Sequence, residues 1–333
     1  GESHLPPQWP VWESMMRVFF YLLSLAVLAT VPMFVLDSYT RHLFILAFVY
    51  AVIASNWDLS LGYAGLFNFG HLTFFAVGVY SAAIAAKTFG INPWFAIPLG
   101  GITAAVAALI VSLPVARLKG IYVVLVTFGF SQLVLQLILS QSQITGGAGG
   151  MVRIPGLEIG DYRFIRDFKF GYYYVALGLL ALSTAYLFWL TKSPFGKSLL
   201  AVRDNEDYAK ARGISVARQR VLALVASAIF PGIVGGFFAI YLRVAAPEVL
   251  SFSTLSLALS MVLIGGTATI YGPILAAIVL TFATEAMAGI RGMEEARFIV
   301  VAVGMILILR FAPGGLARIV SIAGARLFKE SKT

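Results

Sequence analysis

Residues 172–242 contain two long apolar stretches separated by a polar segment: YYYVALGLLALSTAYLFWL (172–190), TKSPFGKSLLAVRDNEDYAKARGISVARQR (191–220) and VLALVASAIFPGIVGGFFAIYL (221–242). A helix of about 20 apolar residues is long enough to cross the hydrocarbon core of a bilayer. The polar segment carries seven basic and three acidic side chains counted from residue 192. This pattern predicts two membrane spans joined by a charged, helix-forming segment that offers a surface to a binding partner.

The composition of the whole chain extends this prediction. Of its 333 residues, 60% are hydrophobic and 12% are charged, and the mean hydropathy is +0.91. Soluble domains carry about 25% charged residues. We therefore expect an all-α polytopic membrane protein surrounded by the lipid bilayer. The net charge of +9 is spread thinly and gathers near the ends of apolar runs, so we expect no nucleic-acid partner.

The apolar runs predict about ten transmembrane helices, with a range of eight to ten. Glycines cluster at 62–78 and 254–289, so some of these helices are expected to be broken or re-entrant. The expected spans are 18–36, 42–61, 69–87, 94–113, 121–139, 172–190, 220–242, 254–268, 272–289 and 297–311.

Charge asymmetry predicts the orientation of the spans. Lys and Arg are enriched in cytoplasmic loops, and they predominate at 192–220, at 117–119 and in the tail from residue 310. The loop 141–171 carries four basic and three acidic residues and is expected outside. Ten spans then place both termini in the cytoplasm, and the N-terminal residues lack the basic region of a cleaved signal peptide. The expected domains are 1–17 (cytoplasmic N-terminal segment), 18–311 (transmembrane domain, with the cytoplasmic segment 192–220 and the extracytoplasmic loop 141–171) and 312–333 (cytoplasmic basic tail).

Two features predict close helix packing. Gly232 and Gly236 form a GxxxG pair, and a second stripe of small residues runs at four-residue spacing along the span 94–113. Small side chains let helix backbones approach each other in lipid. The second stripe consists of Gly100, Ala104, Ala108 and Ser112.

Residues for catalysis are sparse. The chain has no cysteine, and its histidines stand apart at His4, His42 and His71, without a second ligand at metal spacing. The sequence GKS at 196–198 resembles the end of a P-loop, but Thr191 stands where that motif requires glycine. We therefore expect no metal, no cofactor and no enzymatic activity in this chain.

Polar side chains at membrane depth mark a possible solute pathway, because they avoid lipid. Near the second and third spans they lie beside clustered glycines, which fit either a tight surface loop or a broken helix along a water-filled path. On the fifth span they share one helical face and either bond a neighbouring helix or line a pathway. The pathway candidates are Asn56, Tyr63, Asn68, His71, Gln132 and Gln136, and the glycines given a structural role are Gly62, Gly65, Gly70, Gly146, Gly147, Gly265 and Gly266.

Five segments together resemble one family. LGYAGLFNFGHLTFFAVGVYSA (61–82), TGGAGGM (145–151), SPFGKSLLAVRDNEDYAKARGI (193–214), MVLIGGTATIYGPILAA (261–277) and LRFAPGGLARI (309–319) are similar to segments of LivM-type permease subunits of ATP-binding-cassette importers for branched-chain amino acids. The resemblance covers most of the chain from about residue 40. One glycine motif alone is a weak signal, but five in the same order are specific.

The resemblance implies a role for the polar segment. In such importers a short cytoplasmic coupling helix of the permease docks into the ATPase subunit, with an acidic residue, an alanine and, four positions after the alanine, a glycine. Asp207, Ala209 and Gly213 match this pattern, whereas Tyr208 stands where many importers have alanine. Residues 204–207, three of which are acidic, are expected at the start of this helix, and Gly213 at its end. The coupling residues implied are Arg203, Asp204, Asn205, Glu206, Asp207, Ala209 and Gly213.

The resemblance also implies the partners and the location. These are a second homologous permease subunit, two cytoplasmic ATP-binding subunits that bind the ATP, and an extracytoplasmic substrate-binding protein, in the plasma (inner) membrane of a prokaryote. The chain would form half of the translocation path and work by alternating access. Similar permeases carry urea, short amides or other acids, so the substrate stays open at this stage.

Two other classes of protein remain as alternatives. A stand-alone, ion-coupled secondary transporter or channel for a small polar solute would need a titratable group at membrane depth, and Asp58, His71 and Glu285 are its candidates. A membrane-embedded enzyme would need a convergent acid, base and nucleophile, which the sequence does not offer.

Overall fold

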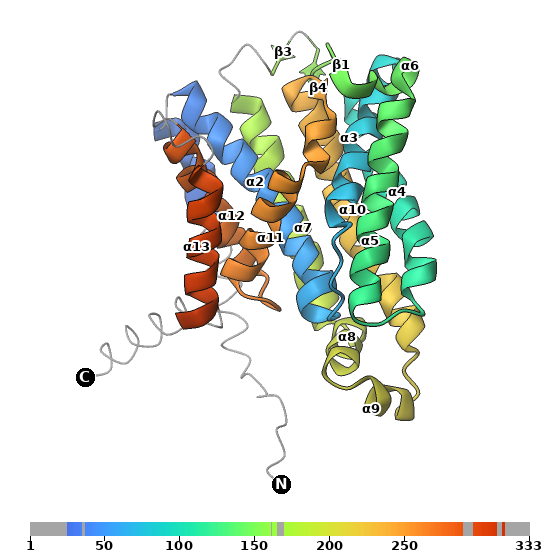
Figure 1. Ribbon diagram of the computed structural model, residues 1–333. Coiled ribbons are helices and arrows are strands. Elements are labelled where there is room, and N and C mark those ends of the chain that lie inside the picture. Colours follow the sequence, from blue (N-terminus) through green and yellow to red (C-terminus); the bar gives the residue numbers. More distant parts are fainter. Residues whose placement is uncertain are drawn as a thin grey trace, which may run out of the picture.

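Helix α2 (Ser38–Asp58) runs through the middle of a helical bundle (Figure 1). Asp37 caps its N-terminus: the carboxylate accepts hydrogen bonds from the backbone N–H groups of Tyr39 and Thr40. The second half of α2 is buried on nearly all sides, as expected for a helix that is apolar all round. It continues into the π-helical turn η1 (Leu59–Tyr63), which ends in a non-helical stretch before the next helix.

The structure is a computed structural model that describes residues 25–34, 37–160, 162–164, 170–288, 296–311 and 315–316. A helix at Leu25–Phe34 precedes α2. The elements after η1 are α3 (His71–Lys87), α4 (Pro93–Val115), α5 (Ile121–Ser140), α6 (Ser142–Thr145), η2 (Gly147–Gly149), β1 (Met151–Val152), β2 (Glu158–Ile159), β3 (Tyr162–Arg163), α7 (Phe170–Lys192), α8 (Pro194–Asp204), α9 (Glu206–Ala211), α10 (Val216–Leu242), β4 (Val244–Ala245), η3 (Pro247–Leu250), α11 (Phe252–Gly265), α12 (Tyr271–Ala288) and α13 (Ala296–Phe311).

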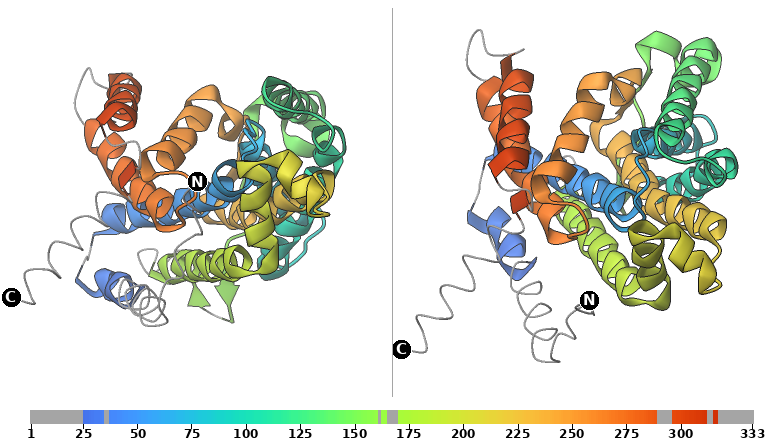
Figure 2. Two further views of the ribbon diagram at one scale, coloured as in Figure 1. Left: turned by 90° about the horizontal axis from the view of Figure 1, so that it is seen from below. Right: turned by 60° about the horizontal axis from the view of Figure 1, so that its bottom comes forward.

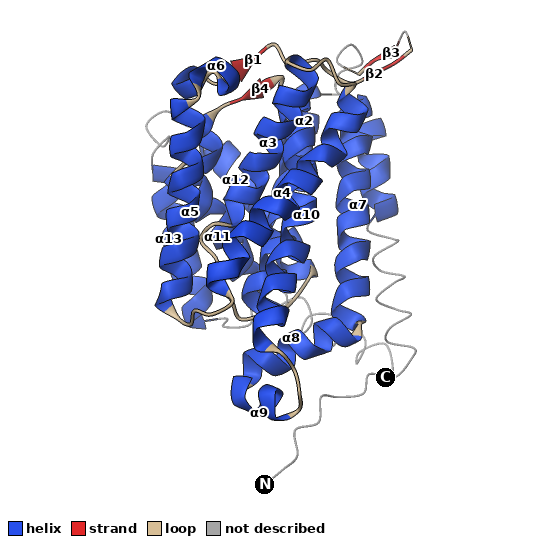
Figure 3. Cartoon of the chain, turned by 90° about the vertical axis from the view of Figure 1, so that its right-hand side faces the viewer, coloured by secondary structure: helices blue, strands red, loops and turns tan. Residues whose placement is uncertain are grey.

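The two ends of the bundle differ. At one end, β1 pairs with β4 and β2 with β3, both antiparallel. The strands β1 and β4 lie near α6, and β2 and β3 lie at the other side of the same end (Figure 3). At the opposite end, α8 and α9 project from the bundle, and they lie across it when it is seen from below (Figure 2). The segments predicted to face opposite sides of the membrane therefore lie at opposite ends of the molecule.

The multi-pass helical fold is confirmed, but the count of ten spans is not. In the part of the chain that the structure describes, six helices are long and apolar enough to cross a membrane by length and composition: Ser38–Tyr63, Pro93–Val115, Ile121–Ser140, Phe170–Lys192, Val216–Leu242 and Tyr271–Ala288. The helix Leu25–Phe34, α3 and α11 are apolar but shorter. The glycine-containing stretches at 64–70 and 266–270 are not helical, so α3 begins late and α11 ends early. Residues 18–24 and 35–36 of the expected span 18–36, and most of the tail 312–333, lie outside the described residues.

The tightest helix packing brings α3, α4 and α10 together. A Cβ atom added at Gly78 would lie 2.1 Å from the carbonyl oxygen of Gly232, and one added at Gly100 would lie 2.5 Å from the same oxygen. A Cβ added at Gly232 would lie 2.4 Å from the Cβ of Ala104. The small residues predicted to lie at helix contacts thus do so, and glycine is required because the neighbour is backbone rather than a movable side chain.

We predict that Gly232→Val destabilises the bundle by roughly 1–3 kcal/mol, the usual cost of overpacking. The thermal unfolding midpoint of the purified protein in detergent measures the effect. Gly178→Val is the matched control, because a Cβ at Gly178 on α7 meets nothing within 4 Å. Equal melting temperatures for the two variants would contradict the packing assigned to Gly232.

Candidate functional site

The polar segment folds into two short helices rather than one. Ser193 caps α8, and Asn205 adopts an extended conformation that ends α8 and caps α9, its side-chain oxygen accepting the Tyr208 N–H at 2.9 Å. Asp204 therefore ends α8, and the expectation that it begins the coupling helix is wrong. Asparagine favours caps because its side chain bonds nearby backbone groups. Glu206 and Asp207 occupy the first turn of α9, where negative charge is favourable.

The end of α9 follows the pattern expected for Gly213. This residue has φ +80°, and its N–H donates to the carbonyl of Lys210 at 2.9 Å. The N–H of Ile214 donates to the carbonyl of Ala209 at 3.0 Å. The left-handed conformation suits glycine, which lacks a Cβ. Ala209 is buried with Val202 and Val216, so α8, α9 and the start of α10 share a small apolar core.

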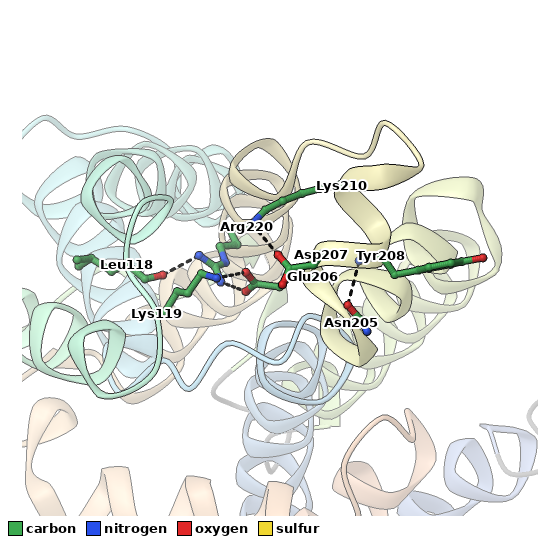
Figure 4. Close-up of polar contacts among 8 residues, drawn as sticks. All are labelled: Leu118, Lys119, Asn205, Glu206, Asp207, Tyr208, Lys210 and Arg220. Atoms are coloured by element: carbon green, nitrogen blue, oxygen red, sulfur yellow. Dashed lines mark hydrogen bonds and ion pairs between the residues drawn. The ribbon is translucent and has the colours of Figure 1, made fainter.

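Glu206 ties α9 to the membrane bundle (Figure 4). Its carboxylate forms an ion pair of 2.8 Å with Lys119 in the turn between α4 and α5, and it accepts a hydrogen bond from Arg220 on α10. Arg220 also donates to the carbonyl of Leu118 at 2.6 Å. Burial raises the pKa of the Glu206 carboxyl, but the hydrogen bond from Lys119 and the charge of Arg220 outweigh burial, so the pKa lies below its usual value. Glu206 is therefore ionised at neutral pH, and its stabilising contribution is lost only as the pH falls through this lowered pKa.

The neighbouring side chains point into solvent. The Asp207 side chain is 91% exposed and Asp204 66%, whereas Glu206 is 24% exposed. Asp207 pairs with Lys210 at 3.4 Å, and Arg212 donates to the Tyr208 hydroxyl at 2.7 Å. Exposed pairs of this kind contribute little to stability. Little energy is therefore lost when these side chains exchange their partners.

Arg203 points back toward the bundle instead of outward. Its Nη1 donates to the carbonyl of Gly62 in η1 at 2.8 Å, and its Nε and Nη2 donate to Asp204 at 3.0 and 2.9 Å. Gly65 has φ +67°, and a Cβ added there would lie 2.8 Å from the Arg203 Cγ. The sequence offered no sign of this contact, because the two partners are far apart in the chain and one of them is a backbone oxygen.

Asp58 is fully buried where α2 meets η1. Its two carboxylate oxygens accept the N–H groups of Ala268 and Thr269 at 2.8 and 2.9 Å. These donors lie in the turn between α11 and α12. Both oxygens are thus engaged by backbone, which favours a structural clamp over the ion-coupling role that Asp58 would have in a secondary transporter. Glu285, another candidate for that role, accepts the Tyr39 hydroxyl at 3.0 Å.

The pathway candidates have different surroundings. Asn56 donates to the Ser183 hydroxyl on α7 at 2.7 Å, so it joins two helices. Asn68 accepts the Gly70 N–H at 2.9 Å and shapes the turn before α3. His71 is buried and stacks on Trp57, with ring centroids 5.3 Å apart. Tyr63 is half-buried in η1, whereas the side chains of Gln132 and Gln136 lie on the exposed face of α5.

The glycines singled out in the sequence occupy restricted positions. Gly65, Gly146, Gly147 and Gly266 have positive φ. A Cβ would lie within 2.6 Å of a neighbouring atom at each of Gly62, Gly70 and Gly265. Among the described residues, no three His, Asp or Glu side chains are grouped so as to hold a metal ion.

Comparison with known proteins agrees with these features. The family model for the branched-chain amino acid transport system / permease component matches residues 39–309. The high-affinity branched-chain amino acid transport system permease protein LivM of Escherichia coli (strain K12) is 31% identical over 73% of this chain and 62% of its own length. The protein of the same name from Salmonella typhimurium is 28% identical over the same shares.

A more distant relative is the probable branched-chain amino acid transport permease protein LivM of Methanocaldococcus jannaschii, which is 25% identical over 58% of this chain and 65% of its own. The chain thus spans less than two thirds of the length of these curated relatives. No solved structure matches it. Because the family model covers most of the chain, from within α2 to within α13, the protein belongs to the family of permease components of branched-chain amino acid transport systems.

Proposed function

We propose that the chain is the permease subunit of an ABC importer that forms half of the translocation path for branched-chain or related amino acids. A second homologous permease supplies the other half, two cytoplasmic ATP-binding subunits supply the energy, and an extracytoplasmic binding protein delivers the substrate. The complex lies in the plasma (inner) membrane of a prokaryote, with both termini of this chain in the cytoplasm. The observation that carries this proposal is a charged helical segment fixed to one end of an apolar bundle by buried or half-buried contacts, with its outer side chains left exposed.

The exposed face of α5 supports a path shared with a second subunit. Of the residues in the apolar stretch of α5 that could cross a membrane, only 22% are buried within the chain, whereas 83% are buried in the corresponding stretch of α2 and η1. Gln132 and Gln136 lie on this exposed face, four residues apart on one side of the helix. Amide side chains that face lipid are costly, so this face requires protein or water beside it. A cavity of about 40 Å³ adjoins Ser131 and Gln132.

The exposed outer side of α9 supports docking of the ATP-binding subunits. Asp207 and Tyr208 are exposed on this side, while Glu206 and Ala209 hold α9 in place. A short helix that is fixed to the bundle on its inner side passes its displacement on to the membrane helices, whereas a flexible loop would deform instead. ATP binding then moves α8 and α9, and the path opens alternately to each side of the membrane.

The first test is transport itself. Proteoliposomes that contain this chain, a second permease and two ATP-binding subunits, with binding protein outside, should take up leucine, isoleucine or valine only when ATP is enclosed. Uptake of radiolabelled amino acid measures this. Gradient-driven uptake by the chain alone, without ATP-binding subunits, would instead establish a secondary transporter.

Charge reversal separates docking from anchoring. Asp207→Lys places a repulsive charge on the exposed side of α9, so the affinity for the ATP-binding subunits should fall by about tenfold or more while the permease keeps its melting temperature. Co-purification and thermal unfolding measure the two quantities. Glu206→Lys should lower the melting temperature as well, because it leaves Lys119 and Arg220 beside a third positive charge. Unchanged co-purification of Asp207→Lys would contradict the docking surface.

Substitution of Gly213 tests the rigidity of α9. Valine in the left-handed conformation costs roughly 1–2 kcal/mol, so Gly213→Val should loosen the end of α9 and reduce uptake per ATP hydrolysed. Gly213→Asn is the matched control, because asparagine tolerates this conformation. The ratio of amino acid taken up to phosphate released distinguishes the variants. Equal ratios for both would show that the end of α9 plays no part in coupling.

A further inference from the structure

Three segments that are distant in the sequence meet at the end of the bundle that carries α8 and α9. They are the last turn of α8, the π-helical turn η1, and the turn 266–270 between α11 and α12. All three lie in or overlap the sequence stretches that carry the family resemblance. They are far apart along the chain, so only the fold brings them together. The contacts between them form one continuous chain.

The first contact links α8 to η1. The Arg203 guanidinium donates to the Gly62 carbonyl at 2.8 Å, and its aliphatic stem packs against Gly65, which has φ +67°. A π-helical turn leaves its backbone groups less regularly paired than an α-helix does. A charge-assisted hydrogen bond to one of its carbonyls is stronger than a neutral one. Arg203 therefore holds η1 directly.

The second contact links η1 and α2 to the turn between α11 and α12. Asp58 accepts two backbone N–H groups of this turn, from Ala268 and Thr269. Ala268 has φ +59°, which costs energy for a residue other than glycine. The carboxylate stabilises this strained turn because it accepts hydrogen bonds from two adjacent backbone N–H groups of the turn.

The third observation is the lack of free space between these groups. A Cβ added at Gly62 would lie 2.1 Å from the Asp58 carboxylate and 2.3 Å from the Ala268 nitrogen. The same glycine thus accepts the Arg203 hydrogen bond and touches both partners of the Asp58 clamp. On the far side of the turn, a Cβ at Gly315 would lie 2.5 Å from the Gly266 nitrogen. Groups packed this closely shift together or separate outright, because packed interiors do not deform continuously.

Glu206 attaches the polar segment to a different part of the bundle. It holds α9 to the α4–α5 turn and to α10 through Lys119 and Arg220. Arg203 instead connects α8 with α2, η1 and the α11–α12 turn. The polar segment therefore has two separate attachments to two parts of the bundle, and loss of one leaves the other in place.

We propose that Arg203 and Asp58 are positioning residues for transport: through Gly62 they make α8 and the α11–α12 turn move as one body when the ATP-binding subunits displace the polar segment. This rests on the proposed function, since the displacement comes from those subunits. Neither residue touches the substrate. Arg203 passes the displacement to η1, and Asp58 passes it to the start of α12.

Removal of the first link should uncouple the complex without dismantling it. In Arg203→Ala, the amount of amino acid taken up per ATP hydrolysed should fall roughly tenfold, as couplings of this kind allow. Lys197→Ala is the matched control, because Lys197 is an exposed cation on the same helix. Arg203→Lys should restore most of the ratio, since it keeps a donor for the Gly62 carbonyl. Equal ratios for Arg203→Ala and Lys197→Ala would overturn the proposal.

A distance measurement tests the link without any cargo. The chain has no cysteine, so Lys197→Cys and Leu275→Cys can carry two spin labels, one on α8 and one on the exposed side of α12. In the assembled complex their distance should stay constant between nucleotide-free and ATP-bound states, and it should change when Arg203→Ala or Asp58→Asn is added. A distance that changes equally with and without these substitutions would overturn the link. Absence of uptake by the unsubstituted complex, with this distance behaviour intact, would reject the proposed cargo and leave the link standing.

Discussion

The buried carboxylate of Asp58 lets two interrupted helices exist side by side. Buried backbone N–H and C=O groups that have no partner in a helix must be satisfied elsewhere within the protein. Asp58 does this for the turn at 268–269, and Arg203 does it for the Gly62 carbonyl. The turn after α11 and the packing of η1 depend on these contacts. The same contacts that stabilise the interruptions connect the polar segment with the bundle.

This arrangement gives the charged segment an inner and an outer side with different tasks. On the inner side, Glu206 and Arg203 engage two different parts of the bundle. On the outer side, Asp207 and Tyr208 form only exposed pairs with neighbours on α9 and just after it. A segment built in this way stays fixed to the membrane helices while its outer charges remain exposed. The exposed amide face of α5 is the surface on which we propose that the second permease subunit lies.

Much of the fold follows from hydrophobic patterning, since long apolar runs and small-residue stripes act locally and leave a direct record in the sequence. The limits of α7, α10 and α12 and the contact at Gly232 were predictable for that reason. The partners of polar residues were not. Asn56 and Asn68 were pathway candidates because they are polar residues at membrane depth. In the structure, Asn56 bonds α7 and Asn68 shapes the turn before α3. Arg203 had the appearance of a surface cation, because nothing local indicates a bond to a carbonyl 141 residues away.

The side of the membrane on which α9 lies tests the account most directly. A single cysteine at Tyr208, which is 58% exposed in this cysteine-free chain, can be probed with a membrane-impermeant maleimide. The account predicts labelling in inside-out vesicles and not in intact cells, with protection once the ATP-binding subunits are bound. Labelling from the outer face of intact cells would contradict it, because no cytoplasmic ATPase could then reach the segment.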